Sequence, residues 1–202
     1  MNFRIRRYDP KDLDLIYHIT LVTGLAGKDA SPYHTDHKLL GHIWSAPYVV
    51  FEPELAFVAE DAEGVAGYAL GTLDTRRFEK RCEADWWPKL RIAYPKSGED
   101  GRTPHDRAAI DRFHNQPIGP DWVVDDYPAH MHLDILPRLQ GKGVGRALFE
   151  AFATAARAAN VTKIHVGTDP SNESGQGFWK AVGFRPPPEP NDGSGVFVID
   201  LS

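Results

Sequence analysis

The sequence predicts a single α/β domain over residues 1–202, built on a mixed, largely antiparallel β-sheet flanked by helices. Three observations support this prediction. The length of 202 residues is nearest to one domain on a prior of about 150 residues per domain. Residues 55–59 and 65–73 are apolar segments joined by a short polar loop, which predicts an antiparallel hairpin. Residues 130–159 combine an alternating strand pattern, a glycine-rich loop and an amphipathic helix.

The composition is that of an ordinary globular protein. Apolar residues make up 42% of the chain and charged residues 25%, which argues against disorder and coiled coil. The formal net charge of −5 argues against a nucleic-acid partner. Cys82, the single cysteine, cannot form an internal disulfide or a thiolate zinc site, which favours a reducing, cytoplasmic setting. We see no signal-peptide pattern and no apolar stretch of about 20 residues, so we expect a soluble protein without a membrane partner.

The N-terminal part is predicted to begin with a strand followed by a helix. Residues 2–7 alternate apolar and basic side chains, which is strand periodicity. Asp9-Pro10 then precedes apolar residues at helical spacing from Leu13 to Thr20. Glycines and Ser31-Pro32 end this helix, and residues 36–44 are expected to form a second short helix.

A helical insertion is predicted around residues 75–115, between the hairpin and the next strand. Apolar residues recur every four positions over 75–94, which predicts an amphipathic helix that Pro88 ends or kinks. A further helix is predicted over 104–115, and residues 117–128 are predicted to form a loop. This insertion could cover the substrate side or form a dimer contact.

The strand predicted over 130–136 has one apolar face and one polar face, and the polar face comprises His130, His132 and Asp134. These three side chains at period two could hold a metal, as imidazole and carboxylate groups do in many sites. No further His or Glu at a diagnostic spacing completes such a site, so we predict no metal.

A glycine-rich loop follows this strand directly and leads into the next predicted helix. Gln140-x-x-Gly143-x-Gly145 leaves backbone N–H groups unhindered, and the helix N-terminus adds a dipole that favours an anion. Lys142 and Arg146 add positive charge in a chain that is negative overall. The loop therefore predicts a phosphate site, with a tight turn that only feeds a packed helix as the alternative.

Two motifs lie in register in the C-terminal half, and neither contains a P-loop or a Rossmann glycine pattern. Residues 140–145 read Gln-Gly-Lys-Gly-Val-Gly, and Asn172 is followed by Phe178-Trp-Lys-Ala-Val-Gly-Phe184. These motifs resemble the signature Gln/Arg-x-x-Gly-x-Gly/Ala and the closing motif of the GNAT (Gcn5-related) N-acetyltransferase family. The resemblance implies the GNAT acyl-CoA N-acyltransferase fold.

The first half shows a narrower resemblance. A second stretch is similar to the acetyltransferase-like C-terminal domain of protein O-GlcNAcase. It comprises residues 52–72 and, beyond them, Phe78, Cys82, Trp86 and Pro88. The glycoside hydrolase domain of that enzyme has no counterpart in these 202 residues, so glycosidase activity is not implied.

The resemblance also implies a donor site for acetyl-CoA. In the family this donor lies between the fourth and fifth strands, which here implies the backbone of Leu133 and Ile135 and the strand over 163–166. Asn172 and Trp179 are implied to assist. The implied pyrophosphate-binding residues are Gln140, Gly141, Lys142, Gly143, Val144, Gly145 and Arg146.

The family's direct attack by an amine requires loss of a proton, because an unperturbed lysine has a pKa near about 10.4. Asp134 is the predicted catalytic base, and it could instead act as a counter-ion to the amine or form a structural pair. The family's usual tyrosine, which protonates the departing thiolate, is replaced by Trp179, whose indole is no practical proton source. Tyr127, His132 or solvent could substitute, or the thiolate, with a pKa of about 8.5, could leave without an acid.

We therefore predict an acetyl-CoA-dependent N-acetyltransferase acting on a small-molecule or peptide amine. Trp122, Asp125, Asp126 and Tyr127 could receive a cationic amine, or they could only pack within the loop. The alternative function is a non-catalytic module of the same fold that binds acetyl-CoA or a protein partner. Neither the acceptor nor the oligomeric state follows from the sequence.

Overall fold

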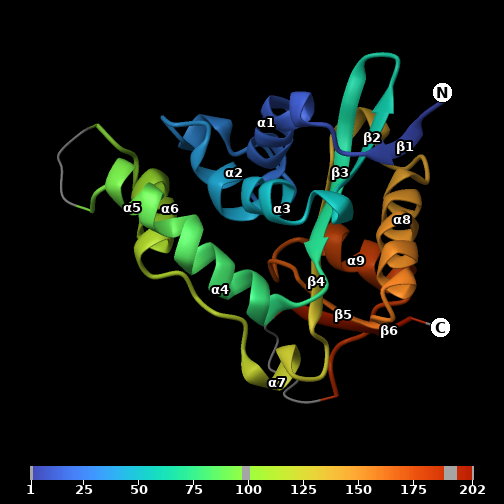
Figure 1. Ribbon diagram of the computed structural model, residues 1–202. Helices are drawn as coiled ribbons and strands as arrows, with labels where there is room; N and C mark the ends of the chain where they lie inside the picture. The colour runs from blue at the N-terminus through green and yellow to red at the C-terminus, as the bar shows by residue number, and fades with distance from the viewer. Residues whose placement is uncertain (1, 97–100, 189–194, 202) are drawn as a thin grey trace.

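The computed structural model describes residues 2–96, 101–188 and 195–201. Its six strands form one sheet in the order of the sequence (Figure 1). Neighbouring strands are antiparallel except for the parallel pair β4 and β5, which confirms the predicted mixed, largely antiparallel sheet. The strands are β1 (Arg4–Arg7), β2 (Phe57–Asp61), β3 (Gly64–Thr72), β4 (Ala129–Ile135), β5 (Lys163–Gly167) and β6 (Val196–Asp200).

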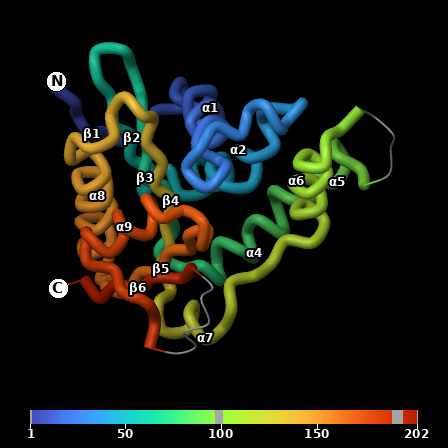
Figure 2. Tube along the Cα trace, turned by 180° about the vertical axis from the view of Figure 1, so that it is seen from behind, coloured from blue at the N-terminus to red at the C-terminus, as the bar shows by residue number. Residues whose placement is uncertain are grey.

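Helices cover both faces of the sheet. Figure 1 and the reverse view in Figure 2 show α8 and α9 on one side and α1 to α6 on the other. The helices are α1 (Leu13–Thr23), α2 (Leu39–Trp44), α3 (Ala46–Phe51), α4 (Thr75–Asp85), α5 (Trp87–Ala93), α6 (Pro104–His114), α7 (Asp121–Val124), α8 (Val144–Ala158) and α9 (Glu173–Ala181).

The central strand β3 separates two apolar cores. It is buried from Val65 to Thr72, because helices pack on both of its faces. Tyr68 and Leu70 belong to the core beneath the helices of the N-terminal half, while Ala69 belongs to the core beneath α8. This alternation follows from the period of two in a β-strand, and it places the polar residues of the neighbouring strand β4 on the Tyr68 side.

Two helices, α4 and α6, begin at capping residues that the sequence supplies. The Asp74 carboxylate accepts a hydrogen bond from the backbone N–H of Arg77 at the start of α4. Thr103 and Asp106 form a reciprocal capping box at the start of α6. These bonds fix the beginnings of two helices that wall the site described below.

Two predicted elements differ from the observed ones, and one observed helix, α3, was not predicted. The helix predicted over 75–94 is two helices, because Pro88 lies in the first turn of α5 and cannot continue the hydrogen bonding of α4. The loop predicted over 117–128 contains the short helix α7, whose four residues give no periodic signal. The helix α3 follows α2 almost at once and begins with Pro47 in its first turn, a position that favours a helix start.

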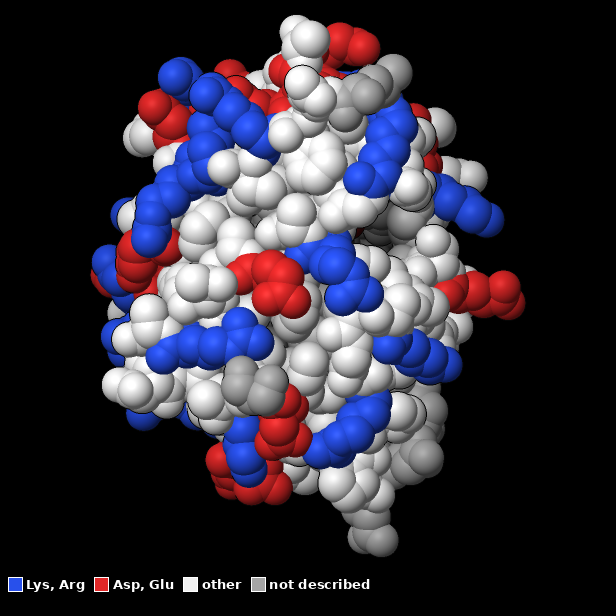
Figure 3. Space-filling model, turned by 90° about the vertical axis from the view of Figure 1, so that its right-hand side faces the viewer, with Lys and Arg blue, Asp and Glu red and all other residues white. Residues whose placement is uncertain are grey.

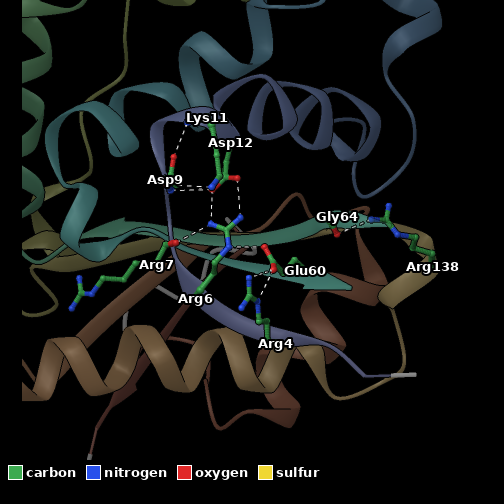
Figure 4. A network of polar contacts seen from close by, with 9 residues as sticks. All are labelled: Arg4, Arg6, Arg7, Asp9, Lys11, Asp12, Glu60, Gly64 and Arg138. Atoms are coloured by element: carbon green, nitrogen blue, oxygen red, sulfur yellow. Dashed lines mark hydrogen bonds and ion pairs between the residues drawn. The ribbon is translucent and has the colours of Figure 1, made fainter. Parts of the chain in front are cut away.

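A network of charged side chains fastens the edge strand β1 (Figure 4). The Arg6 guanidinium donates two hydrogen bonds to the carboxylate of Asp12, at 2.6 and 2.9 Å, and a third to Glu60 at 2.5 Å. Arg4 also contacts Glu60, but its side chain is 72% exposed. Asp12 is only 3% exposed, so Arg6 neutralises a charge that water does not solvate.

Charged side chains of both signs are interspersed over the face seen in Figure 3, which is the right-hand side of Figure 1. Within the ranges that the structure describes, no helix combines the length and apolar character needed to span a membrane.

Candidate active site

The parallel strands β4 and β5 pair over a very short stretch. Their register joins Ala129 to Ile164 and His130 to His165, and no further residues pair. On its other edge, β4 stays paired with β3 as far as Ile135. From Met131 onward, the β4 edge that faces β5 therefore has backbone groups that the sheet does not pair. The predicted donor-binding residues Leu133 and Ile135 lie in this stretch.

The glycine loop lies between the end of β4 and the start of α8. Gly141 and Gly143 have φ values of +69° and +81°, which side-chain-bearing residues rarely adopt. The described chain has no heavy atom, neighbouring residues aside, within 4 Å of where a Cβ would lie at either position. A Cβ on Gly145 would come within 2.7 Å of the Phe178 ring, so this glycine permits close packing of α8 on α9.

The helix α8 begins without a capping side chain. Its N-cap residue is Gly143, which has no side chain to accept a hydrogen bond from the first turn. The first backbone N–H groups of the helix are therefore not capped by a side chain, at the positive end of the helix dipole. Open space and uncapped N–H groups together fit a bound pyrophosphate.

Polar residues of the loop hold it in place. The Gln140 amide donates to the carbonyl of Ile135 at 2.8 Å, which ties the loop to the end of β4. The Arg146 guanidinium donates to the carbonyl of Ala181 at 2.8 Å, which links α8 to the end of α9. Lys142 contacts the carbonyl of Arg138.

Asn172 and Trp179 have structural positions at α9. The Asn172 side chain caps α9 by accepting from the N–H of Gly175 at 2.8 Å. Trp179 is 6% exposed and packs between Phe178 and Phe184 in the core beneath α8. Both residues thus position α9, which packs against the loop through Phe178.

A pocket of about 660 Å³ opens where β4 and β5 part. It lies on the Tyr68 side of the sheet, between the helices of the N-terminal half and the segment that follows α6. Its histidines are His130, His132 and His165. Its charged residues are Arg76, Glu79, Lys80, Glu83, Arg112 and Asp121.

A chain of hydrogen bonds fixes the two β4 histidines. The Thr75 hydroxyl donates to the carbonyl of Pro128 at 2.7 Å, since a carbonyl can only accept. Thr75 Oγ1 must then accept from Nδ1 of His130, also at 2.7 Å. The Tyr48 hydroxyl donates to Nε2 of His130 at 2.7 Å and accepts from Nε2 of His132 at 3.0 Å.

This chain leaves a lone pair on Nδ1 of His132. With its proton on Nε2, the ring presents an unprotonated Nδ1, for which the described residues supply no hydrogen-bond donor. Burial and the neighbouring His165 lower the pKa of His132 to about 4, and burial lowers the pKa of His130 well below its ordinary value. Both rings are therefore neutral near pH 7.

Asp134 lies beyond the pocket on the same strand face. Its carboxylate accepts a hydrogen bond from the Tyr68 hydroxyl at 2.6 Å, and Tyr68 contacts Thr20 at 2.9 Å. Burial raises the pKa of Asp134, and the hydrogen bond from Tyr68 opposes this shift. The residues that line the pocket do not include Asp134. Its role as the catalytic base stays a prediction.

The predicted amine-receiving segment reaches the pocket only in part. Asp121 and Val123 line the pocket, whereas Trp122, Asp125, Asp126 and Tyr127 do not. The Tyr127 ring is 7% exposed, and its hydroxyl accepts from Arg185 at 3.2 Å. Among described residues, no group of three or more His, Cys, Asp or Glu side chains is arranged to hold a metal ion.

Sequence reasoning missed Tyr48, Thr75 and Arg112. Tyr48 and Thr75 lie far from β4 in the sequence, and only the fold brings them to His130. The period-two histidines were the available signal, but they gave no indication of their partners.

Comparison with known proteins identifies the family. A sequence model of the acetyltransferase (GNAT) family matches residues 25–184, which is most of the chain. The chain belongs to the GNAT family. This assignment confirms the resemblance drawn from residues 140–145 and 172–184 and supports an acetyltransferase.

Several proteins are similar to this GNAT chain. The crystal structure of SsHAT is 34% identical with a TM-score of 0.82, covering 98% of this chain and 97% of that one. Protein O-GlcNAcase of Rattus norvegicus is 26% identical over 157 residues, a match covering 77% of this chain but only 17% of that protein. The structure of yncA from Salmonella typhimurium, a putative acetyltransferase with its cofactor acetyl-CoA, shares the fold at 19% identity with a TM-score of 0.54, covering 100% of this chain and 95% of that one.

Proposed function

We propose that this protein transfers the acetyl group of acetyl-CoA to an amine. The observation that carries the proposal is the unpaired edge of β4. This edge leads to the open glycine loop and, where β4 and β5 part, borders the histidine pocket. The family assignment supports acetyl transfer, and yncA, which has the same fold, is described with acetyl-CoA.

The proposed donor site uses backbone groups more than side chains. The first N–H groups of α8 and the loop over 140–146 would hold the pyrophosphate, with Lys142 and Arg146 adding positive charge. The unpaired backbone of β4 at Leu133 and Ile135 would hold the pantetheine arm. Asn172 and Trp179 would contribute by fixing α9 against the loop.

Acetyl-CoA supplies a thioester as the acyl donor. The amine nitrogen forms a bond to the acetyl carbon, the carbon–sulfur bond breaks, and the amine loses one proton while the CoA thiolate gains one. We propose that Nδ1 of His132 takes the amine proton, because this atom carries a lone pair and belongs to a ring that lines the pocket. Asp134 is the second candidate for this role.

The low pKa of His132 defines what such a base does. With a pKa of about 4, the ring does not remove a proton from a free ammonium group. It accepts the proton while the bond between the amine nitrogen and the acetyl carbon forms, because that bond makes the amine proton more acidic. The acceptor is therefore expected to react from its neutral form.

One observation favours a second function, a non-catalytic module that binds acetyl-CoA or a protein partner. Trp179 provides no hydroxyl where the family has its usual tyrosine, and it is buried in the core. Release of CoA thiol, measured with aminosugars, polyamines and lysine peptides, separates the two functions. Turnover that is lost in His132→Gln supports the transferase, whereas saturable acetyl-CoA binding without turnover supports the module.

A further inference from the structure

The pocket beside His132 contains a half-buried cation, Arg112, that the described residues do not neutralise. The Nε atom of Arg112, on α6, is buried without a hydrogen-bond acceptor, and the guanidinium makes no ion pair with the described carboxylates. Burial lowers its pKa, with no carboxylate nearby to oppose the shift.

Lys80 also lines the pocket, but it is exposed to solvent, and the remaining charges at the wall of the pocket have partners. Arg76 contacts both Glu79, at 3.0 Å, and Asp121. Glu83 contacts Arg91 at 2.6 Å, at the rim of the pocket. The carboxylates around the pocket are thus occupied, and none of them approaches Arg112. A buried guanidinium N–H without an acceptor is unfavourable unless a ligand supplies one.

The position of Arg112 is fixed by an aromatic side chain that also contacts His132. The Arg112 guanidinium carbon lies 4.7 Å from the ring centroid of Trp44, which is a cation–π contact. The same indole packs edge-on against the His132 ring, with centroids 5.6 Å apart. One indole therefore separates the unpaired cation from the proposed base.

We propose that the acetyl acceptor carries a carboxylate as well as an amine. The Arg112 fork binds the carboxylate, the amine lies at His132, and the chain between them passes along Trp44. This inference rests on the proposed function and leaves its chemistry unchanged: the N–C bond forms at the amine, and the carboxylate does not react. A single unpaired guanidinium matches one planar carboxylate in charge and geometry.

The apolar walls of the pocket suit the chain between the two charged ends. Ile43, Phe78, Trp87 and Ile118 line it, and its volume of about 660 Å³ is within the range of small-molecule sites. An acceptor with a hydrocarbon spacer would bury that spacer here. The class is therefore an amino acid whose amine and carboxylate are separated by an apolar chain.

Binding of product analogues tests this inference without turnover. Protein saturated with CoA is titrated with ω-acetamido acids of increasing chain length and with the matched N-alkylacetamides, which lack the carboxylate. We expect at least one acid to bind about tenfold or more tightly than its matched amide, because the amide leaves Arg112 unsatisfied. Equal affinities across the series, or no binding of any member, would overturn the inference.

Two variants identify the group responsible. Arg112→Gln should abolish the preference for the acid. Arg81→Gln should retain it, because the Arg81 guanidinium also stacks on a ring, that of Phe51 at 4.4 Å, but lies outside the pocket. An unchanged preference in Arg112→Gln would contradict the assignment. The same titrations without CoA separate this inference from the proposed function, since a protein that fails to bind CoA can still show the preference for acids.

Discussion

The hydroxyl oxygen of Tyr48 lies 3.0 Å from Nε2 of His132 and accepts a hydrogen bond from its N–H group. This contact joins α3 to the strand that borders the donor site, and it assigns the proton of the neutral His132 ring to Nε2. Removing the hydroxyl should therefore change the chemistry of the histidine without removing it.

Tyr48→Phe is expected to lower kcat about tenfold while changing the KM for acetyl-CoA little, because the His132 ring loses its fixed tautomer. The ring of Tyr48 stacks on Phe78 at 4.3 Å, and phenylalanine keeps this stacking. Nitrogen-15 spectra of the histidine rings provide the second readout. In the native protein they should show His132 protonated on Nε2, and in the variant a mixture of tautomers. An identical tautomer in both proteins would contradict the hydrogen-bond chain.

His132→Gln and Asp134→Asn distinguish the two candidate bases. We expect His132→Gln to lower kcat by about 100-fold or more with nearly unchanged affinity for acetyl-CoA. Asp134→Asn should have the smaller effect, because the carboxylate already accepts a hydrogen bond from Tyr68 and does not line the pocket. The opposite order of effects would assign the base to Asp134, as the sequence alone predicted.

Protein stability should fall as the pH is lowered below about 6.5. His130, His132 and His165 have folded-state pKa values below those of an unfolded chain, so the unfolded state binds more protons in this range. The free energy of unfolding should decrease by up to about 1.4 kcal/mol per pH unit for each such histidine, down to its folded pKa. Asp134, whose pKa is raised, opposes the trend only in the acidic range where it titrates.

Urea unfolding between pH 7.5 and 4.5 measures this dependence. His132→Gln should reduce the slope, since one of the histidines with a lowered pKa is then absent. A free energy of unfolding that stays constant from pH 7 to pH 5 would mean that these rings are protonated as easily in the folded chain as in the unfolded one.

Arg6→Gln should destabilise the fold by about 3 kcal/mol, because it leaves the buried carboxylate of Asp12 unpaired. Arg4→Gln is the matched control on the same strand, and it should cost less than about 1 kcal/mol because the Arg4 side chain is 72% exposed. Thermal or urea unfolding checks both. Similar losses of unfolding free energy in the two variants would contradict the claim that the buried Arg6–Asp12 pair is the main stabilising contact of the network in Figure 4.

The parts of the fold that sequence predicted are those with local signals. The hairpin of β2 and β3 follows from two alternating segments and a short turn, and the loop before α8 follows from glycines at fixed spacing. The split between α4 and α5 was signalled by Pro88 but could not be placed to the residue. The four residues of α7 are too few for any periodic pattern.

The sequence predicted the part of the candidate site that one continuous segment forms. It did not predict the contacts between residues that are far apart in the sequence. Residues 133–146 form a continuous stretch, so their arrangement along β4 and the loop could be read from the chain. Tyr48 contacts His132 although the two residues are 84 positions apart in the sequence. Arg112 acquires its setting from Trp44 on a distant helix. Such pairings arise from tertiary packing and leave no periodic trace in the sequence.

Titration calorimetry with acetyl-CoA tests the central claim most directly. The native protein should bind acetyl-CoA saturably, and Gly143→Asp should abolish binding by placing a carboxylate at the uncapped start of α8. Gly143→Ala is the matched control, because it carries the same strain at a φ of +81° without the charge, and it should still bind. No binding to the native protein, or equal affinity in the Asp and Ala variants, would contradict the proposed donor site.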